Sequence, residues 1–183
     1  MGSIMKDYEH LRHRYRPEHI KFLLIAESPP PEAEVESSRQ FYRSGPYRND
    51  RLFINTIRAL YPETVATPQG VLENGKEQWL RRFQRDGWYM IEALEVSQVH
   101  EVTKQQRQTR IKEALPRLIA RVRELASADT HIILIKSNVF EVAAEPLRSA
   151  GFSVLNTELV DYPGQYNQSS YRRKLNMLRR LVN

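Results

Sequence analysis

The chain has 183 residues, contains no cysteine and carries a formal net charge of +6, from 28 Lys and Arg against 22 Asp and Glu. Its length fits one domain over residues 1–183, and the lack of cysteine excludes disulfides and cysteine-ligated zinc or iron–sulfur clusters. No apolar run reaches the ~20 residues of a membrane span and no signal-peptide core is present, so we expect a soluble, cytoplasmic protein that contacts no membrane.

The first half of the chain predicts helices at 4–15, 49–60 and 76–85 and strands at 20–26 and 88–94. The first helix follows from apolar residues spaced three and four apart, and Pro17 ends it. The first strand follows from a short apolar run that the prolines at 29–31 stop, which is typical of a strand buried on both faces. The stretch 61–75, with two prolines and two glycines, predicts a loop.

The second half predicts helices at 107–126, 138–149 and 168–182 and strands at 131–135 and 152–160. Pro116 predicts either a kink in the first of these helices or a late helix start near Glu113. Strands that alternate with helices indicate right-handed crossovers and a parallel sheet. We therefore expect an α/β fold with three α/β/α layers around a four-stranded parallel sheet.

Polar side chains close three of the predicted strands. Glu27 follows the first strand, Glu92 lies near the end of the second, and Asp161 and Tyr162 follow the fourth. Ligands of open α/β sheets bind beyond the carboxyl ends of the strands, so these groups define a candidate site. A purely structural alternative is that Glu27 forms a salt bridge with an arginine.

Two basic segments, 104–123 and 169–183, accompany this edge. The second contains Arg172, Arg173, Lys174, Arg179 and Arg180 without an acidic residue, and Tyr166 and Tyr171 lie beside it. Such clusters favour phosphate contacts, although they are equally typical of a solvated helix face.

Two further motifs give only weak evidence of a binding site. The stretch Gly70–Glu77 resembles a phosphate loop, but Glu77 replaces the hydroxyl residue that binds magnesium and no strand precedes Gly70. His10 and His13 are three residues apart, and two ligands make a weak metal site. We expect no metal and no other cofactor.

Four segments, in this order along the chain, resemble the uracil-DNA glycosylase superfamily. Ala26-Glu27-Ser28-Pro29-Pro30 is similar to the first glycosylase motif, and residues 39–45 resemble the stretch that carries a base-stacking Phe, which Phe41 matches. The strand that ends at Glu92 matches one that ends in a base-reading Asn in the family. Tyr162-Pro163-Gly164 takes the place of the family's His-Pro-Ser loop.

The resemblance implies a uracil-DNA glycosylase-like fold without an iron–sulfur cluster, a nucleic-acid partner such as DNA, and a DNA-repair hydrolase that cleaves an N-glycosidic bond. It differs from the family at Ser28, Glu92 and Tyr162, which replace a catalytic Asp or Asn, a base-reading Asn and a His. The roles it implies are catalytic for Glu27, Glu32 and Tyr162, base-binding for Ser28, Phe41 and Glu92, and nucleic-acid-binding for Gly164, Asn167, Arg172 and Arg173.

Two alternatives to an enzyme remain open. The chain would be an inactive nucleic-acid-binding protein if it keeps only the fold and the basic residues, and its affinity would then fall steeply with salt. It would instead hold a small nucleotide or a nucleobase-like metabolite if the basic helices are merely solvated.

Overall fold

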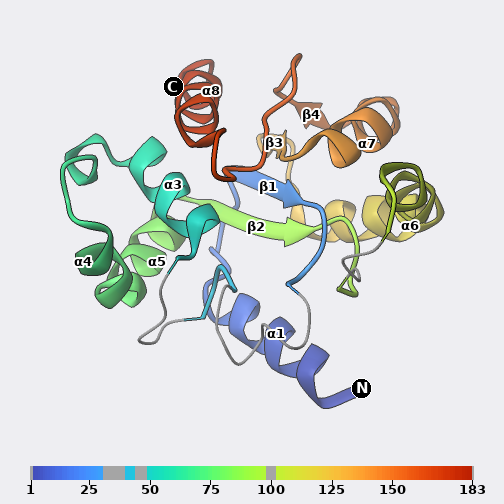
Figure 1. Ribbon diagram of the computed structural model, residues 1–183. Coiled ribbons are helices and arrows are strands. Elements are labelled where there is room, and N and C mark those ends of the chain that lie inside the picture. Colours follow the sequence, from blue (N-terminus) through green and yellow to red (C-terminus); the bar gives the residue numbers. More distant parts are fainter. Residues whose placement is uncertain (1, 31–39, 44–48, 98–101, 183) are drawn as a thin grey trace.

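The computed structural model describes residues 2–30, 40–43, 49–97 and 102–182 (Figure 1). Four parallel strands form one sheet in the order β2-β1-β3-β4: β1 (Phe22–Ala26), β2 (Trp88–Glu92), β3 (His131–Leu134) and β4 (Ser153–Val154). The register pairs Ala26 with Glu92 and Ile25 with Leu134, so the carboxyl ends of β1, β2 and β3 lie nearly level. The chain passes from β2 on one side of β1 to β3 on the other, which makes the gap between β1 and β3 the point where the strand order reverses.

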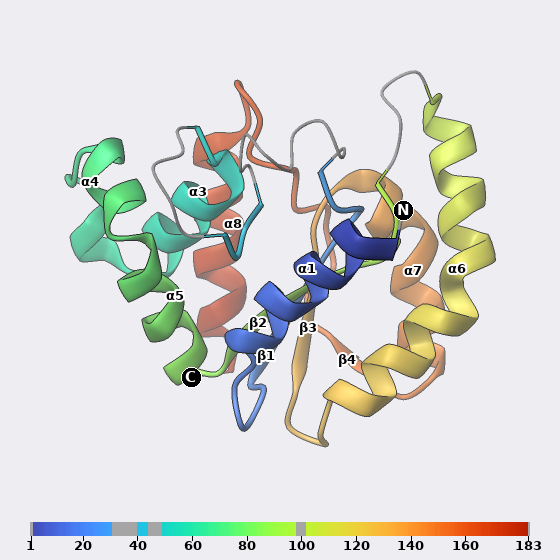
Figure 2. The same cartoon turned by 90° about the horizontal axis from the view of Figure 1, so that it is seen from below.

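Helices lie on both sides of this sheet. They are α1 (Gly2–Arg14), α3 (Arg51–Leu60), α4 (Gln69–Asn74), α5 (Lys76–Arg85), α6 (Lys104–Leu125), α7 (Ser137–Ser149) and α8 (Gln168–Arg180), with a short 3-10 turn at Pro62–Thr64. Figures 1 and 2 show α1 and α8 on opposite sides of the sheet. Helix α3 packs against α8, and α6 packs against α7. The expected α/β/α layering around a parallel sheet is therefore confirmed.

The hydrophobic core is centred on β1 and β2, whose residues are all buried. Strands covered by helices on both faces require continuous apolar runs, and this explains why the sequence of these strands does not alternate. The rings of Phe22 and Trp88 stack with centroids 4.1 Å apart at the amino end of the two strands. Asp50 begins α3 by accepting a hydrogen bond from the backbone N–H of Phe53, and the apolar face of α3 is buried in the same core.

Helix α6 differs from its expected bounds. It begins at Lys104, because Thr103 and Gln106 form a capping box: the Thr103 hydroxyl accepts from the Gln106 N–H, and the Gln106 side chain accepts from the Thr103 N–H. The start expected near Glu113 is wrong, since the helix continues through Pro116. Figure 2 shows α6 changing direction about midway along its length, as the alternative of a kink predicts.

Strand β4 is much shorter than the expected strand at 152–160. Leu155 N still donates to Ile132 O at 2.9 Å, and the side chain of Asn156 then takes over the pairing with β3: its Oδ1 accepts from Leu134 N at 3.0 Å, and its Nδ2 donates to Leu134 O at 3.1 Å. Backbone pairing returns only at Val160, which bridges to Ile135. The loop expected at 61–75 is also partly helical, since it contains α4 and the 3-10 turn.

Candidate functional site at the carboxyl edge of the sheet

The candidate site lies where β1 and β3 end side by side. Glu27 directly follows β1, and Lys136 and Asn138 lie in the turn and the first residues of α7 that follow β3. Arg107 reaches the same place from the first turn of α6. In open α/β sheets the reversal of strand order leaves a crevice at this position, where ligands commonly bind.

Glu27 is buried and accepts contacts from three side chains: one comes from α6, and two come from the turn after β3 and the start of α7. Nη1 of Arg107 donates to its Oε1 at 3.0 Å, and Nζ of Lys136 lies 3.0 Å from the same oxygen. Nδ2 of Asn138 donates to Oε2 at 2.7 Å. The expected alternative of a salt bridge to an arginine is confirmed for Arg107, while the lysine and the amide were not expected.

These contacts fix the protonation state of Glu27. Burial raises the pKa of the carboxyl, but the hydrogen bonds from Asn138, Lys136 and Arg107 together lower the pKa below its ordinary value. Glu27 is therefore ionised at neutral pH. An ionised carboxylate can orient donors or stabilise a positive charge, but its low pKa makes it a weak proton acceptor.

Lys136 has a backbone conformation that side-chain-bearing residues rarely adopt, with φ 81° and ψ 142°. Among the described residues Asn49 is the other non-glycine residue with positive φ, and asparagine tolerates it better. The conformation is fixed from both sides: the Lys136 N–H donates to Val160 O at 2.7 Å, and the Lys136 carbonyl accepts from Phe140 N at 3.1 Å. Such backbone strain costs about 1–3 kcal/mol and concentrates at functional sites.

Asn138 carries a further polar atom at this site. The residue is only 4% exposed, and its Oδ1 has no hydrogen-bond partner within the described residues. Since its Nδ2 is committed to Glu27, the amide cannot turn without losing that bond. A buried acceptor of this kind is costly unless a water or a ligand group donates to it.

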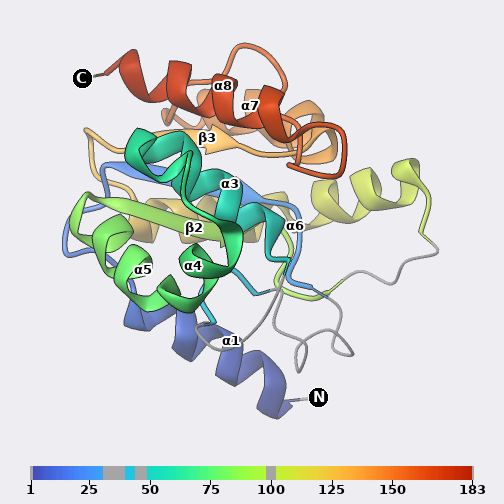
Figure 3. The same ribbon diagram turned by 60° about the vertical axis from the view of Figure 1, so that its left-hand side comes forward.

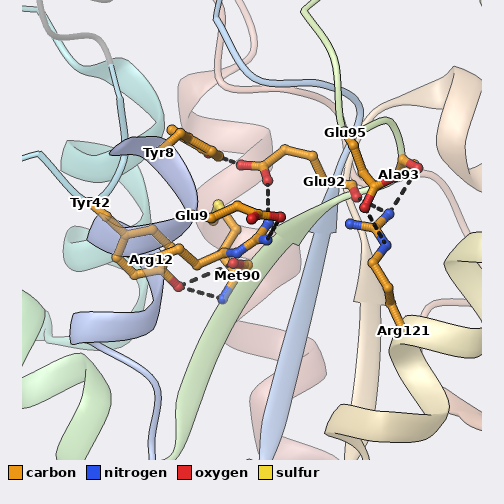
Figure 4. A network of polar contacts seen from close by, with 9 residues as sticks. All are labelled: Tyr8, Glu9, Arg12, Tyr42, Met90, Glu92, Ala93, Glu95 and Arg121. Atoms are coloured by element: carbon orange, nitrogen blue, oxygen red, sulfur yellow. Dashed lines mark hydrogen bonds and ion pairs between the residues drawn. The ribbon is translucent and has the colours of Figure 1, made fainter. Parts of the chain in front are cut away.

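Glu92 belongs to a different network, which ties α1 to the end of β2 (Figure 4). Tyr8 donates a hydrogen bond to its Oε1, and Nη1 of Arg12 donates to Oε2 at 3.1 Å. Arg121 of α6 donates to the backbone carbonyls of Glu92 and Ala93. Burial dominates here and raises the pKa of Glu92 above its ordinary value. The Glu92 carboxylate is thus buried inside the protein, where it is hydrogen-bonded to two side chains of α1.

Phe41 lies in the core. Its side chain is 3% exposed and packs against Tyr42, Phe53 and Phe83, with ring centroids 5.0, 5.9 and 5.3 Å away. Phe41 contacts core rings and Glu92 contacts Tyr8 and Arg12, whereas Glu27 contacts Arg107, Lys136 and Asn138. The three residues therefore lie in separate contact networks and do not share one slot. Ser28 remains beside Glu27 and is partly buried, whereas Glu32 lies outside the described residues.

The loop between β4 and α8 presents the remaining expected residues. Tyr162 is 43% exposed and its carbonyl accepts from Gly164 N at 2.7 Å. Asn167 precedes α8 and is exposed, as is Arg173, whereas Arg172 donates to Oδ1 of Asn55 at 3.0 Å. Figures 2 and 3 place this loop at the same end of the sheet as the chain that leaves β1.

The basic segments are only partly available to a ligand. Lys104 pairs with Glu141 at 2.9 Å, and Lys174 pairs with Glu158 at 3.3 Å. Arg107 holds Glu27, and Nη1 of Arg179 donates to Leu60 O at 2.8 Å. These cations already contact acidic side chains or backbone carbonyls of the protein, so a ligand would have to compete with those partners.

In the described ranges no group of three or more His, Asp or Glu residues is arranged to hold a metal ion. No helix in that part of the chain is long and apolar enough to cross a membrane. Comparison with protein-family models, with curated proteins and with solved structures finds no match to this chain.

Proposed function

We propose that the protein binds nucleic acid at the carboxyl edge of its sheet. One observation carries this proposal: Tyr166, on the loop between β4 and α8, is 89% exposed. A tyrosine exposed to this extent contributes little to folding, and its ring is accessible for stacking on a base. The loop stands at the same end of the sheet as the chain that leaves β1 (Figure 2), and Glu27 is the first residue after that strand.

The surroundings of Tyr166 fit a nucleotide strand. Tyr162 presents a second, partly exposed ring on the same loop, and Arg173 is exposed in the following helix α8. Bases stack on aromatic side chains while cations track the phosphates, and this combination is typical of proteins that bind single strands. A free nucleotide would need only one aromatic contact, so the two exposed tyrosines on one loop favour a polymer over a small metabolite.

We further propose that the bound strand is a substrate, and that the protein hydrolyses the N-glycosidic bond of a damaged or deaminated base in the manner of a uracil-DNA glycosylase. The support is the position of Glu27 in the segment that resembles the first glycosylase motif, together with its ionised state. A carboxylate held ionised stabilises the positive charge that develops on the sugar as the base leaves. Because its pKa is low, Glu27 acts through its negative charge and not as a proton acceptor. Its position directly after β1 places this charge at the carboxyl edge of the sheet.

Binding is tested by fluorescence anisotropy with a labelled single-stranded oligonucleotide. Tyr166→Ala should weaken binding about 5- to 150-fold, since stacking on one base contributes ~1–3 kcal/mol, whereas Tyr166→Phe should retain it. Val71→Ala removes an exposed apolar side chain from α4 and is the matched control, expected to bind as the wild type does. Equal affinity of Tyr166→Ala and wild type would contradict the proposal.

Hydrolysis is tested by single-turnover assays on oligonucleotides that carry uracil, hypoxanthine, xanthine or alkylated bases. We expect an abasic product from at least one of them, and its loss in Glu27→Gln. Oligonucleotide binding without any abasic product would contradict the proposed hydrolysis and support a nucleic-acid-binding protein that is not an enzyme. Tight binding of a free nucleotide without affinity for the oligonucleotide would favour the small-ligand alternative.

A further inference from the structure

Lys136 occupies a backbone position where glycine would be relaxed. Its φ of 81° lies in the left-handed half of conformational space, and the bonds to Val160 and Phe140 on either side leave the turn no freedom to change it. A lysine that persists under such strain, beside the point where strand order reverses, indicates that its side chain has a use that glycine cannot supply.

The side chain of Lys136 is the accessible member of the group around Glu27. It is 37% exposed, whereas Asn138 is buried and Arg107 is largely covered. Glu27 keeps the hydrogen bonds from Arg107 and Asn138 if the lysine turns away. The carboxylate therefore positions the ammonium without depending on it, and Lys136 can exchange Glu27 for an anionic ligand.

We propose that Lys136 is a phosphate-binding residue of the site, and that Glu27 and Asn138 are its positioning residues. This inference rests on the proposed function and deepens it, since it names the side chain that holds the backbone of the bound strand. A lysine ammonium recognises phosphate as a compact point charge. The unpartnered Oδ1 of Asn138 supplies an acceptor for a hydroxyl or a bridging water of the same ligand.

Three variants separate charge from strain. Lys136→Met removes the ammonium and keeps the strained conformation, Lys136→Gly removes both, and Lys136→Arg keeps both. The readout is the slope of log K against log salt concentration for the single-stranded oligonucleotide, because each lost phosphate contact lowers its magnitude by about 0.7. We expect this decrease, with weaker binding, in Lys136→Met and Lys136→Gly, and a wild-type slope in Lys136→Arg.

Thermal unfolding supplies the second readout. Both uncharged variants lose the same contact with Glu27, so the difference between them reports the relieved strain minus the additional conformational entropy that glycine loses on folding. We expect Lys136→Gly to unfold at least about 2 °C above Lys136→Met. If Lys136→Met keeps the wild-type affinity and salt slope, the role of Lys136 is overturned. The proposed function is still upheld in that case, provided that the wild type binds the oligonucleotide.

Adenosine monophosphate and inorganic phosphate distinguish the source of the phosphate in calorimetric titrations. If wild type binds no oligonucleotide but binds adenosine monophosphate, and Lys136→Met loses that binding, the role of Lys136 is supported and the nucleic-acid proposal is contradicted. If no phosphate-bearing probe binds the wild type, both are overturned.

Discussion

Nζ of Lys136 lies 3.0 Å from Oε1 of Glu27 and thereby joins the exits of β3 and β1, the two strands between which the chain reverses its order. The ammonium reaches this oxygen from a backbone with φ 81°. Neither residue makes the site alone: the carboxylate is buried among donors, and Lys136 is the partly exposed side chain among them. This pair is the centre of the candidate site.

Glu27 should make the protein more stable as the pH rises from strongly acidic values. Because the folded-state pKa of Glu27 lies below the ordinary value of about 4.3, the unfolded chain binds more protons in this window. The contribution is present above that value and is lost as the pH falls through the folded pKa. In urea unfolding between pH 3 and 7, the free energy of unfolding should rise less with pH in Glu27→Gln than in wild type. Identical pH profiles would contradict the assignment.

Glu92 should have the opposite effect. Its raised pKa means that the folded state retains the proton more tightly, so its contribution to stability declines as the pH rises above about 4.3 toward the folded pKa. Glu92→Gln abolishes this titration. The stability of wild type relative to Glu92→Gln should therefore fall across that window in the same unfolding series. A relative stability that rises instead would show that Arg12 and Tyr8 outweigh burial.

Phe41 should behave as a core residue. Phe41→Ala should lower the free energy of unfolding by about 3–5 kcal/mol, because it leaves a cavity between Phe53 and Phe83. The milder Phe41→Leu should fold and should bind the oligonucleotide with wild-type affinity. A Phe41→Leu variant that keeps its stability but loses binding would instead support a direct contact with a base.

Lys76 should be needed for folding and dispensable for phosphate binding. Its ammonium lies 2.6 Å from Oδ2 of Asp50 and donates to Gln40 O at 2.8 Å, and both side chains of the ion pair are buried. Lys76→Met leaves the Asp50 charge unpaired and should cost about 3–5 kcal/mol in urea unfolding. Asp50→Asn should also destabilise the protein, because its single oxygen can cap α3 or face the Lys76 ammonium but cannot do both. Equal stability of Lys76→Met and wild type would refute the structural role.

Continuous apolar runs made β1 and β2 predictable, because burial on both faces requires them. The truncation of β4 was not predictable from residue types, since Asn156 replaces the backbone ladder with a side-chain amide whose partner, Leu134, is distant in sequence. The start of α6 was readable from the spacing of Thr103 and Gln106, which form a capping box.

For the candidate site, chain order placed Glu27 at the carboxyl edge, but it could not show which groups would reach it. Lys136 was missed because lysine gives no sign of positive φ, although its place in the turn after the clearest strand was a usable signal. Glu92 was expected at the same edge, yet α1 covers it through Tyr8 and Arg12, and helix docking of this kind leaves no mark in the spacing of strands.

The most direct test of nucleic-acid binding at the carboxyl edge is the salt dependence of single-stranded oligonucleotide affinity for wild type and Tyr166→Ala. We predict measurable binding at low salt, a linear decrease of log K with log salt concentration, and weaker binding by Tyr166→Ala at every salt concentration. Failure of the wild type to bind at low salt, or affinities for the two proteins that coincide throughout, would contradict it.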